Sequence, residues 1–168
     1  MKNKIQDLVN RLELEKHPEG GYFKETHRSI GEITEENLGA NFKGSRNYST
    51  TIYFLLTSDN FSAFHRIKQD EIWHFYDGSP IRLHVITKEG IYKEYIIGRD
   101  FAKGQLPQRI VKGGDWFASE VMGDNSYSLA GCTVSPGFTF EDFEMKSKNE
   151  LVELFPEHEE VIGRLTRY

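Results

Sequence analysis

The fold is decided by residues 50–87, which read TTIYFLLTSDNFSAFHRIKQDEIWHFYDGSPIRLHVIT. Short segments rich in β-branched and aromatic residues alternate in this stretch with turn clusters, Ser58-Asp59-Asn60 and Asp77-Gly78-Ser79-Pro80. β-Branched and aromatic residues favour a half-buried strand, and Asn, Asp, Gly and Pro favour the turns between strands. We therefore expect strands at 50–57, 61–67, 71–76 and 81–87.

The same alternation extends outward over residues 20–143, where further strands are expected at 91–97, 116–121 and 126–134. Short strands at such regular spacing are typical of a β-sandwich or barrel. An apolar stripe predicts one amphipathic helix over about 3–14. Ser147 with Glu150 forms a capping-box pattern, and Pro156 suits the first position of a second short helix, so helices are expected over about 147–166. Without an internal linker, residues 1–168 are expected to form one domain.

Composition narrows the classes of partner. The 168 residues include 21 Lys and Arg against 26 Asp and Glu, and the net charge of −5 repels phosphate backbones, so no nucleic-acid partner is expected. The longest apolar runs, such as 52–56, are far shorter than a membrane-spanning helix. The charged N-terminus lacks the apolar stretch of a signal peptide, which favours a cytoplasmic location. The lone Cys132 excludes a thiolate cluster or an internal disulfide.

Three ionisable residues cluster in the middle of the chain: His65, Glu71 and His74. If 61–67 and 71–76 are neighbouring strands of a hairpin joined by 68–70, then His65 and Glu71 lie near the same end of that hairpin. They are then expected to face one cavity. Simple strand alternation turns His74 to the opposite face, so only a bulge would bring it to the same site.

This arrangement resembles the first motif of the cupin superfamily. In His65-x-Ile67-x3-Glu71-x6-Gly78 the His, Glu and Gly positions match, and Ile67 replaces the second His of the motif. The second cupin motif is best matched by 111–120, where Gly113 is retained and Trp116 stands at the position of the last metal-ligand His.

A narrower resemblance covers about residues 8–145. The segments that carry it are 17–23 (HPEGGYF), 64–66 (FHR), 70–75 (DEIWHF) and 135–138 (SPGF), and they are similar to a small single-cupin group known as a domain of unknown function. The resemblance implies an all-β jelly roll, also described as a double-stranded β-helix, with short terminal helices, usually paired as a homodimer. It implies no particular reaction. Residues 20–25 also resemble the early strand of nucleotide-sugar 3,5-epimerases of the same superfamily.

Metal-free chemistry is the first functional hypothesis. His65 would act as acid or base and Glu71 would orient it, as the epimerases of the superfamily pair a His base with a Tyr acid, here Tyr53 or Tyr48. A small polar ligand, sugar-like or nucleotide-sugar-like, is expected in the barrel, with ligand-binding positions at Tyr53, Trp73, His74 and Trp116.

Two alternatives remain open from the sequence. In a metal-dependent oxygenase or isomerase, His65, Glu71 and His74 would ligate a divalent ion. In a protein that binds a ligand without turnover, the same polar residues would only orient that ligand or satisfy one another. Because two of the usual cupin ligand positions hold Ile67 and Trp116, no cofactor is expected in the first hypothesis.

Overall fold

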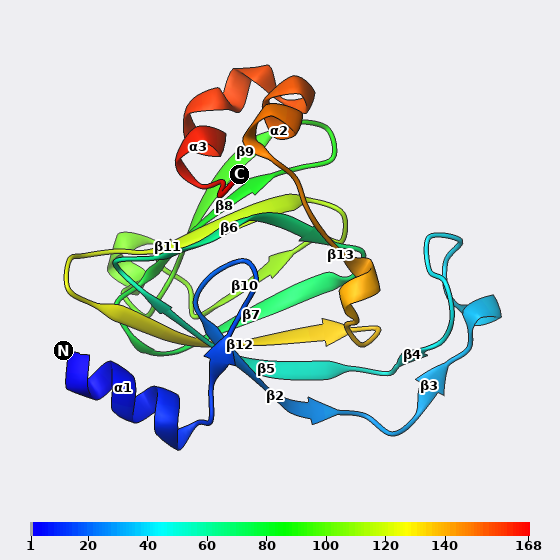
Figure 1. Ribbon diagram of the computed structural model, residues 1–168, viewed down its shortest axis with the longest axis horizontal. Helices are drawn as coiled ribbons and strands as arrows, with labels where there is room; N and C mark the ends of the chain where they lie inside the picture. Colours follow the sequence, from blue (N-terminus) through cyan, green and yellow to red (C-terminus); the bar gives the residue numbers. More distant parts are fainter. Residues whose placement is uncertain (1) are drawn as a thin grey trace.

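The computed structural model describes residues 2–168, which form two antiparallel sheets packed face to face as a jelly-roll barrel (Figure 1). The six-stranded sheet contains, in spatial order, β1 (Glu15–Lys16), β2 (Tyr22–Arg28), β5 (Thr50–Thr57), β12 (Tyr127–Ser135), β7 (Asp70–Gly78) and β10 (Gln108–Val111). The five-stranded sheet contains β13 (Phe143–Met145), β6 (Phe61–Ile67), β11 (Trp116–Val121), β8 (Ile81–Ile86) and β9 (Tyr92–Ile97). A separate ribbon pairs β3 (Glu32–Ile33) with β4 (Arg46–Asn47). The all-β jelly roll expected from the sequence is thus confirmed.

Short helices flank the barrel. They are α1 (Lys2–Arg11), α2 (Lys148–Leu154), α3 (Glu159–Arg164) and four 3-10 turns, η1 (Glu35–Asn37), η2 (Phe101–Lys103), η3 (Phe140–Asp142) and η4 (Pro156–His158). The capping box at the start of α2 is formed, with Ser147 and Glu150 bonding each other's backbone N–H groups, and Pro156 opens η4. None of the helices in the described part of the chain is long and apolar enough to cross a membrane.

The expected hairpin between 61–67 and 71–76 is wrong. β6 pairs with β11 and β13 in one sheet, whereas β7 pairs with β12 and β10 in the other. The short connection between β6 and β7 therefore crosses from sheet to sheet, where Gly114 donates its N–H to the carbonyl of Ile67. Residues of β6 and β7 still face one another, because the inner faces of both sheets line the same interior.

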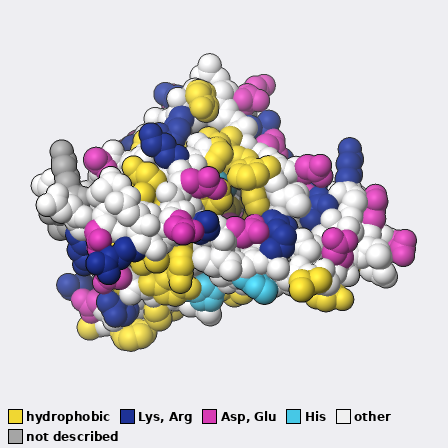
Figure 2. All heavy atoms as spheres, turned by 60° about the horizontal axis from the view of Figure 1, so that its bottom comes forward, with side chains coloured by type: hydrophobic (Ala, Val, Ile, Leu, Met, Phe, Trp, Pro, Cys, Tyr) yellow, Lys and Arg dark blue, Asp and Glu magenta, His cyan; other side chains and the backbone are white. Residues whose placement is uncertain are grey.

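Three apolar clusters hold these layers together. The central one lies between the sheets and includes Phe54, Trp73 and Phe117. A second packs α2 and α3 onto the outer face of the five-stranded sheet, and a third packs α1 against the outer face of the six-stranded sheet (Figure 1). The face seen in Figure 2 mixes acidic and basic side chains among groups of hydrophobic ones, so it presents no single-sign patch.

Candidate functional site

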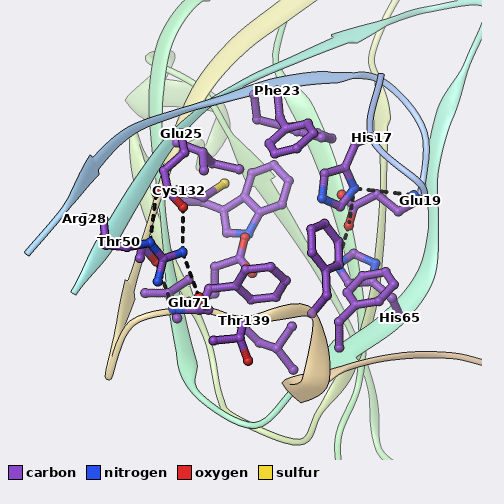
Figure 3. A pocket seen from close by; sticks show the side chains of 18 residues that line it. His17, Glu19, Phe23, Glu25, Arg28, Thr50, His65, Glu71, Cys132 and Thr139 are labelled. Carbon is purple, nitrogen blue, oxygen red and sulfur yellow. Dashed lines mark hydrogen bonds and ion pairs between the residues drawn. The ribbon is translucent and has the colours of Figure 1, made fainter. Parts of the chain in front are cut away.

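A cavity of about 110 Å³ lies between the two sheets, and Figure 3 shows the side chains that line it. Its walls come from β2, β5, β6, β7, β12 and the segment around η3. Half of the lining residues are apolar or aromatic, and the others are His17, Glu19, Glu25, Arg28, Thr50, His65, Glu71, Cys132 and Thr139. The cavity therefore encloses an unusual concentration of ionisable groups in an apolar surrounding.

The buried partner of His65 is Glu19. Nε2 of His65 lies 3.0 Å from Oε2 of Glu19, and the hydroxyl of Ser62 donates to Oε1 of Glu19 at 2.9 Å. Burial by itself would raise the pKa of Glu19, but the charges of His65 and His17, with the hydrogen bonds from His65 and Ser62, lower it to about 2. Glu19 is therefore ionised at neutral pH.

Both ring nitrogens of His65 are occupied. Nδ1 donates to the carbonyl of Ala63 at 2.7 Å, and because a carbonyl only accepts, Nδ1 must carry a hydrogen. Nε2 faces the ionised Glu19 and therefore carries one too. Although burial opposes it, the charge and hydrogen bond of Glu19 raise the pKa of His65. His65 is thus a buried imidazolium whose N–H groups both point to protein acceptors.

A tight turn before β2 brings Glu19 to this position. Gly20 and Gly21 adopt φ of 120° and 74°, which side chains rarely tolerate. A Cβ on Gly20 would lie 2.1 Å from the carbonyl oxygen of Phe61, so the turn lies directly against β6. The N–H of Ala63 also donates to the carbonyl of Glu19, at 2.9 Å. Glycine at both positions lets the carboxylate of Glu19 reach β6.

A bulge in β6 completes the arrangement. His65 pairs with Phe117 and Ser62 with Ser119, so three steps along β6 match two along β11. The extra residue turns Ser62 and His65 to the same side of the strand, where regular alternation would separate them. Both side chains consequently contact Glu19.

Glu71 provides a second carboxyl group of different character. It lines the cavity, is 8% exposed, and forms no ion pair within residues 2–168. Cys132, whose thiol opposes the rise of the Glu71 pKa, lines the same cavity. Burial raises the pKa of Glu71 to about 7, against the opposing charge of His65 and with a smaller contribution from Glu19. The cavity thus holds one carboxylate kept ionised and one carboxyl group that titrates near neutrality.

Two polar groups at the cavity have no protein partner. Nε1 of Trp73 and Oγ1 of Thr139 are buried and make no hydrogen bond to any residue in the described part of the chain. Trp73 is only 1% exposed. Buried donors are nearly always satisfied, so these two groups point to an acceptor supplied from outside the protein.

Arg28 and Glu25, which both line the cavity, form an ion pair with two hydrogen bonds. Nε and Nη2 of Arg28 donate to the two carboxylate oxygens of Glu25 at 3.0 and 2.7 Å, and Nη2 also donates to the carbonyl of Phe138 (Figure 3). The pairing of β2 with β5 shifts register between Glu25 and His27, so this strand too contains a bulge that places Glu25 and Arg28 on one side.

The segment around η3 forms one wall, and a buried pair anchors it. Nε and Nη2 of Arg46 donate to the two oxygens of Asp142 at 2.7 and 2.8 Å, and Gln69 donates to Asp142 at 2.7 Å. Burial opposes ionisation, but the hydrogen bonds from Arg46, Gln69 and Lys68 lower the pKa of Asp142. The ribbon β3–β4 therefore holds η3 over the cavity through Arg46.

Of the residues expected at the site from the sequence, the structure places His65, Glu71 and Trp73 around the cavity. Tyr53 faces away, in the cluster under α1 and in edge contact with the ring of Tyr76. Tyr48 is 55% exposed and does not line the cavity.

His74 and Trp116 also lie outside the cavity. His74 points outward and bonds the hydroxyl of Thr133 at 3.2 Å, because the register shift of β7 against β12 comes only at Tyr76, beyond His74. Trp116 packs under α2 and α3, with the guanidinium of Arg66 over its ring.

A divalent metal does not fit the donors present. Within residues 2–168, no group of three or more His, Cys, Asp or Glu side chains is arranged to hold an ion. The expected third ligand, His74, is on the other face of its strand, and both nitrogens of His65 are directed at protein oxygens. The donor set thus supplies an internal ion pair and leaves no open coordination position.

Glu19 was missed by the sequence reasoning, which expected Glu71 to orient His65. Glu71 lies near enough to His65 to influence its pKa, but the hydrogen bond comes from Glu19. A usable signal was present in the segment 17–21, where a His and a Glu directly precede a Gly-Gly turn at the start of a strand.

The fold is a cupin-type barrel. Its two sheets have the strand order of that fold, a cavity lies between them, and His65 on β6 lines the cavity. Residues 6–146 match a family model described as Cupin superfamily (DUF985), and the chain belongs to that family.

Relatives agree in sequence and in fold. The uncharacterized protein YML079W of Saccharomyces cerevisiae is 34% identical over 160 residues, which is 89% of this chain and 79% of the yeast protein. The structure of a hypothetical protein from Leishmania major is similar with a TM-score of 0.88 and 37% identity, covering 97% and 98% of the two chains. Oxalate decarboxylase from Bacillus subtilis is similar at a TM-score of 0.55 with 12% identity, covering 89% of this chain and 36% of that one, which shows the shared fold alone.

Proposed function

We propose that this cupin barrel binds a small organic molecule in its cavity and isomerises it by moving a proton, without a metal ion, with the carboxyl group of Glu71 accepting and returning that proton. The observation that carries the proposal is the placement of Glu71. Its carboxyl group lines the cavity, is buried, and has no cationic partner among residues 2–168. A carboxyl group left in this state has little structural value, because burying it without a partner destabilises the fold.

The contrast between the two carboxyl groups supports acid–base chemistry. Glu19 is held ionised by His65, whereas the pKa of Glu71 is raised to about 7 by burial. A group that exchanges protons works best when its pKa is near the working pH, and a pair of carboxyl groups separated in this way is typical of acid–base sites.

The proton balance is simple. The carboxylate form of Glu71 takes a proton from a carbon atom next to a carbonyl group of the ligand, and the electron pair of that C–H bond becomes an enolate. The carboxylic acid then returns the proton to the other face or to another atom of the ligand. Because the proton is returned, the reaction is an isomerisation or epimerisation that needs no oxidant, reductant or second substrate.

His65 is assigned a positioning role in this proposal. Its two N–H groups are already bonded to Ala63 and Glu19, so they are not directed at a ligand. The positive charge of His65 instead limits how far burial raises the pKa of Glu71. This role differs from the direct acid or base expected from the sequence.

Deuterium exchange tests the proposal. Small cyclic ketones, lactones and monosaccharides are screened by thermal shift, and each compound that binds is incubated with the protein in D₂O and followed by proton NMR. We expect deuterium to enter next to the carbonyl, at the same rate with or without a chelator. Glu71→Gln should abolish incorporation while binding is retained, and Glu144→Gln, which removes an exposed carboxylate paired with Arg66, should leave it unchanged.

Three outcomes would overturn parts of the proposal. Incorporation that persists in Glu71→Gln removes Glu71 as the proton carrier. Loss of incorporation with chelator makes the reaction metal-dependent. Binding without incorporation for every bound compound makes the barrel a binding protein without turnover.

A further inference from the structure

The cavity also limits what the ligand can be, and this step rests on the proposed function of the same site. We propose that the ligand is a neutral molecule the size of a single ring, with a carbonyl-type oxygen that accepts hydrogen bonds from the indole N–H of Trp73 and the hydroxyl of Thr139.

The size of the cavity supports a ligand of one ring. Its volume of about 110 Å³ is of the same order as the ~150 Å³ apolar cavity that holds one benzene molecule in an engineered protein. Phe54 and Trp73 meet edge to face with ring centroids 5.6 Å apart, and His17 and Phe140 stack at 6.0 Å. Such walls suit one ring, and a nucleotide does not fit inside them.

The charges around the cavity support a neutral ligand. Within the described residues, the two cations at the cavity are already committed, His65 to Glu19 at 3.0 Å and Arg28 to both oxygens of Glu25. A carboxylate or phosphate inside the cavity would meet no free cation and would lie close to Glu71. Burying an unpaired anion is strongly unfavourable, so the ligand is expected to be neutral.

The two side chains without hydrogen-bond partners, Trp73 and Thr139, support a ligand with a carbonyl-type oxygen. Nε1 of Trp73 only donates, and the hydroxyl of Thr139 donates and accepts, so an acceptor oxygen on the ligand would satisfy either group. Among the described residues, no other buried side-chain nitrogen or oxygen atom at the cavity is without a hydrogen bond. A sugar ring has a hydroxyl group on almost every carbon atom and would bury several of them unpaired. A ring with one carbonyl oxygen matches the lining better than the sugar-like ligand expected from the sequence.

The same two donors suit the proposed reaction. When a proton leaves the carbon next to the carbonyl, negative charge develops on the carbonyl oxygen, and hydrogen-bond donors aimed at that oxygen stabilise the transition state. Glu71 and Trp73 are two positions apart on β7 and both line the cavity, so the proton acceptor and one oxygen donor come from the same strand.

Four probes of one ring size test the ligand class. Cyclohexanone has the ring and the oxygen, methylenecyclohexane lacks the oxygen, cyclohexanecarboxylate adds a negative charge, and methyl glucoside adds hydroxyl groups. Each is titrated into ¹⁵N-labelled protein while the two indole N–H signals are followed. The chain contains two tryptophans, and the spectrum of Trp73→Phe assigns both signals.

We expect cyclohexanone to shift the Trp73 signal and to leave the Trp116 signal in place. Its Kd should be roughly tenfold lower than that of methylenecyclohexane, and Thr139→Val or Trp73→Phe should each raise it by a similar factor. Trp116→Phe is the matched control, because Trp116 packs beneath α2 and α3, and it should leave the Kd unchanged. If Trp73→Phe does not fold, the wild-type titrations and Thr139→Val still decide the question.

The two proposals fail separately. Equal binding of cyclohexanone and methylenecyclohexane, tighter binding of the carboxylate or the glucoside, or no shift of the Trp73 signal with any probe would overturn the ligand class. Cyclohexanone that binds as expected but shows no Glu71-dependent deuterium incorporation would overturn the proton-transfer function and leave the ligand class standing.

Discussion

Oε2 of Glu19 and Nε2 of His65 are 3.0 Å apart, although the two residues come from a loop before β2 and from β6 in the opposite sheet. Each is less than a tenth exposed. The pair therefore joins the two halves of the barrel at the cavity, and it fixes the charge state of His65 independently of any ligand.

Removing the carboxylate of this pair should be costly. Glu19→Gln leaves His65 without its counter-charge, and breaking a buried pair in this way typically costs about 3 kcal/mol. We expect a decrease of that order in the free energy of unfolding at pH 6, measured by urea denaturation. Glu13→Gln, which removes an exposed partner of Lys24, should change it by less than about 0.5 kcal/mol. Similar effects of the two substitutions would contradict a buried ion pair.

Stability should depend on the titration of Glu71. Its folded pKa of about 7 lies above the ordinary value of 4.5 for a glutamate, so the protonated form is favoured by folding. The contribution is fully present below pH 4.5 and is lost as the pH rises through about 7, a change of roughly 3 kcal/mol. Because His17, Glu19 and His65 also titrate, the measurement is the difference between wild type and Glu71→Gln across pH 4–8. A difference that does not vary with pH would contradict the raised pKa.

The buried pair of Arg46 and Asp142, which holds η3 in place, can be tested separately. Asp142→Asn removes the charge that Arg46 contacts with two hydrogen bonds, and a loss of about 3 kcal/mol of stability is expected because Arg46 is only 3% exposed. Hydrogen exchange of residues 138–143 should become faster. Glu141→Gln is the neighbouring control, since Glu141 is exposed and 3.9 Å from Arg46, and it should have little effect. Unchanged exchange in Asp142→Asn would show that the pair does not hold this wall.

The turn before β2 makes a steric prediction. In Gly20→Ala the new methyl group would lie 2.1 Å from the carbonyl oxygen of Phe61, at a φ of 120°. We expect a loss of at least about 1–3 kcal/mol and, in the NMR spectrum, a His65 ring that no longer shows a raised pKa. Gly39→Ala is the control, because a Cβ there meets nothing within 4 Å. If the pKa of His65 stays raised in Gly20→Ala, the turn is not what positions Glu19 against His65.

Much of the fold could be predicted because it depends on local patterns. The strands 50–57, 61–67 and 116–121 end where their turn residues begin, and β5, β6 and β11 have these bounds. The short strand β10 was not predicted, because Gln108–Val111 is a brief segment with little alternation, formed by pairing with β7. The pairing of β6 was also not predictable, since a three-residue connection suits a hairpin as well as a crossing between sheets.

The candidate site was predictable only in part. His65, Glu71 and Trp73 follow from strand alternation and from the cupin resemblance, and all three line the cavity. The proximity of Glu19 to His65 depends on a contact between distant segments, which alternation along one strand does not encode. Tyr53 illustrates the opposite error, because its chemistry suits a site but its position on β5 turns it toward α1.

The bulges in β2 and β6 make the site depend on the count of residues as well as on their identity. Inserting one residue into the partner strand opposite each bulge, in β11 between Phe117 and Ser119 or in β5 between Thr51 and Ile52, would match the extra residue and restore regular alternation. One member of the pair Ser62 and His65, or of the pair Glu25 and Arg28, would then turn to the outer surface. Every functional side chain would still be present in the chain, yet the cavity would lose its arrangement. Scanning single-residue insertions along the partner strands β5 and β11 would therefore map determinants of the site that substitution scanning cannot detect.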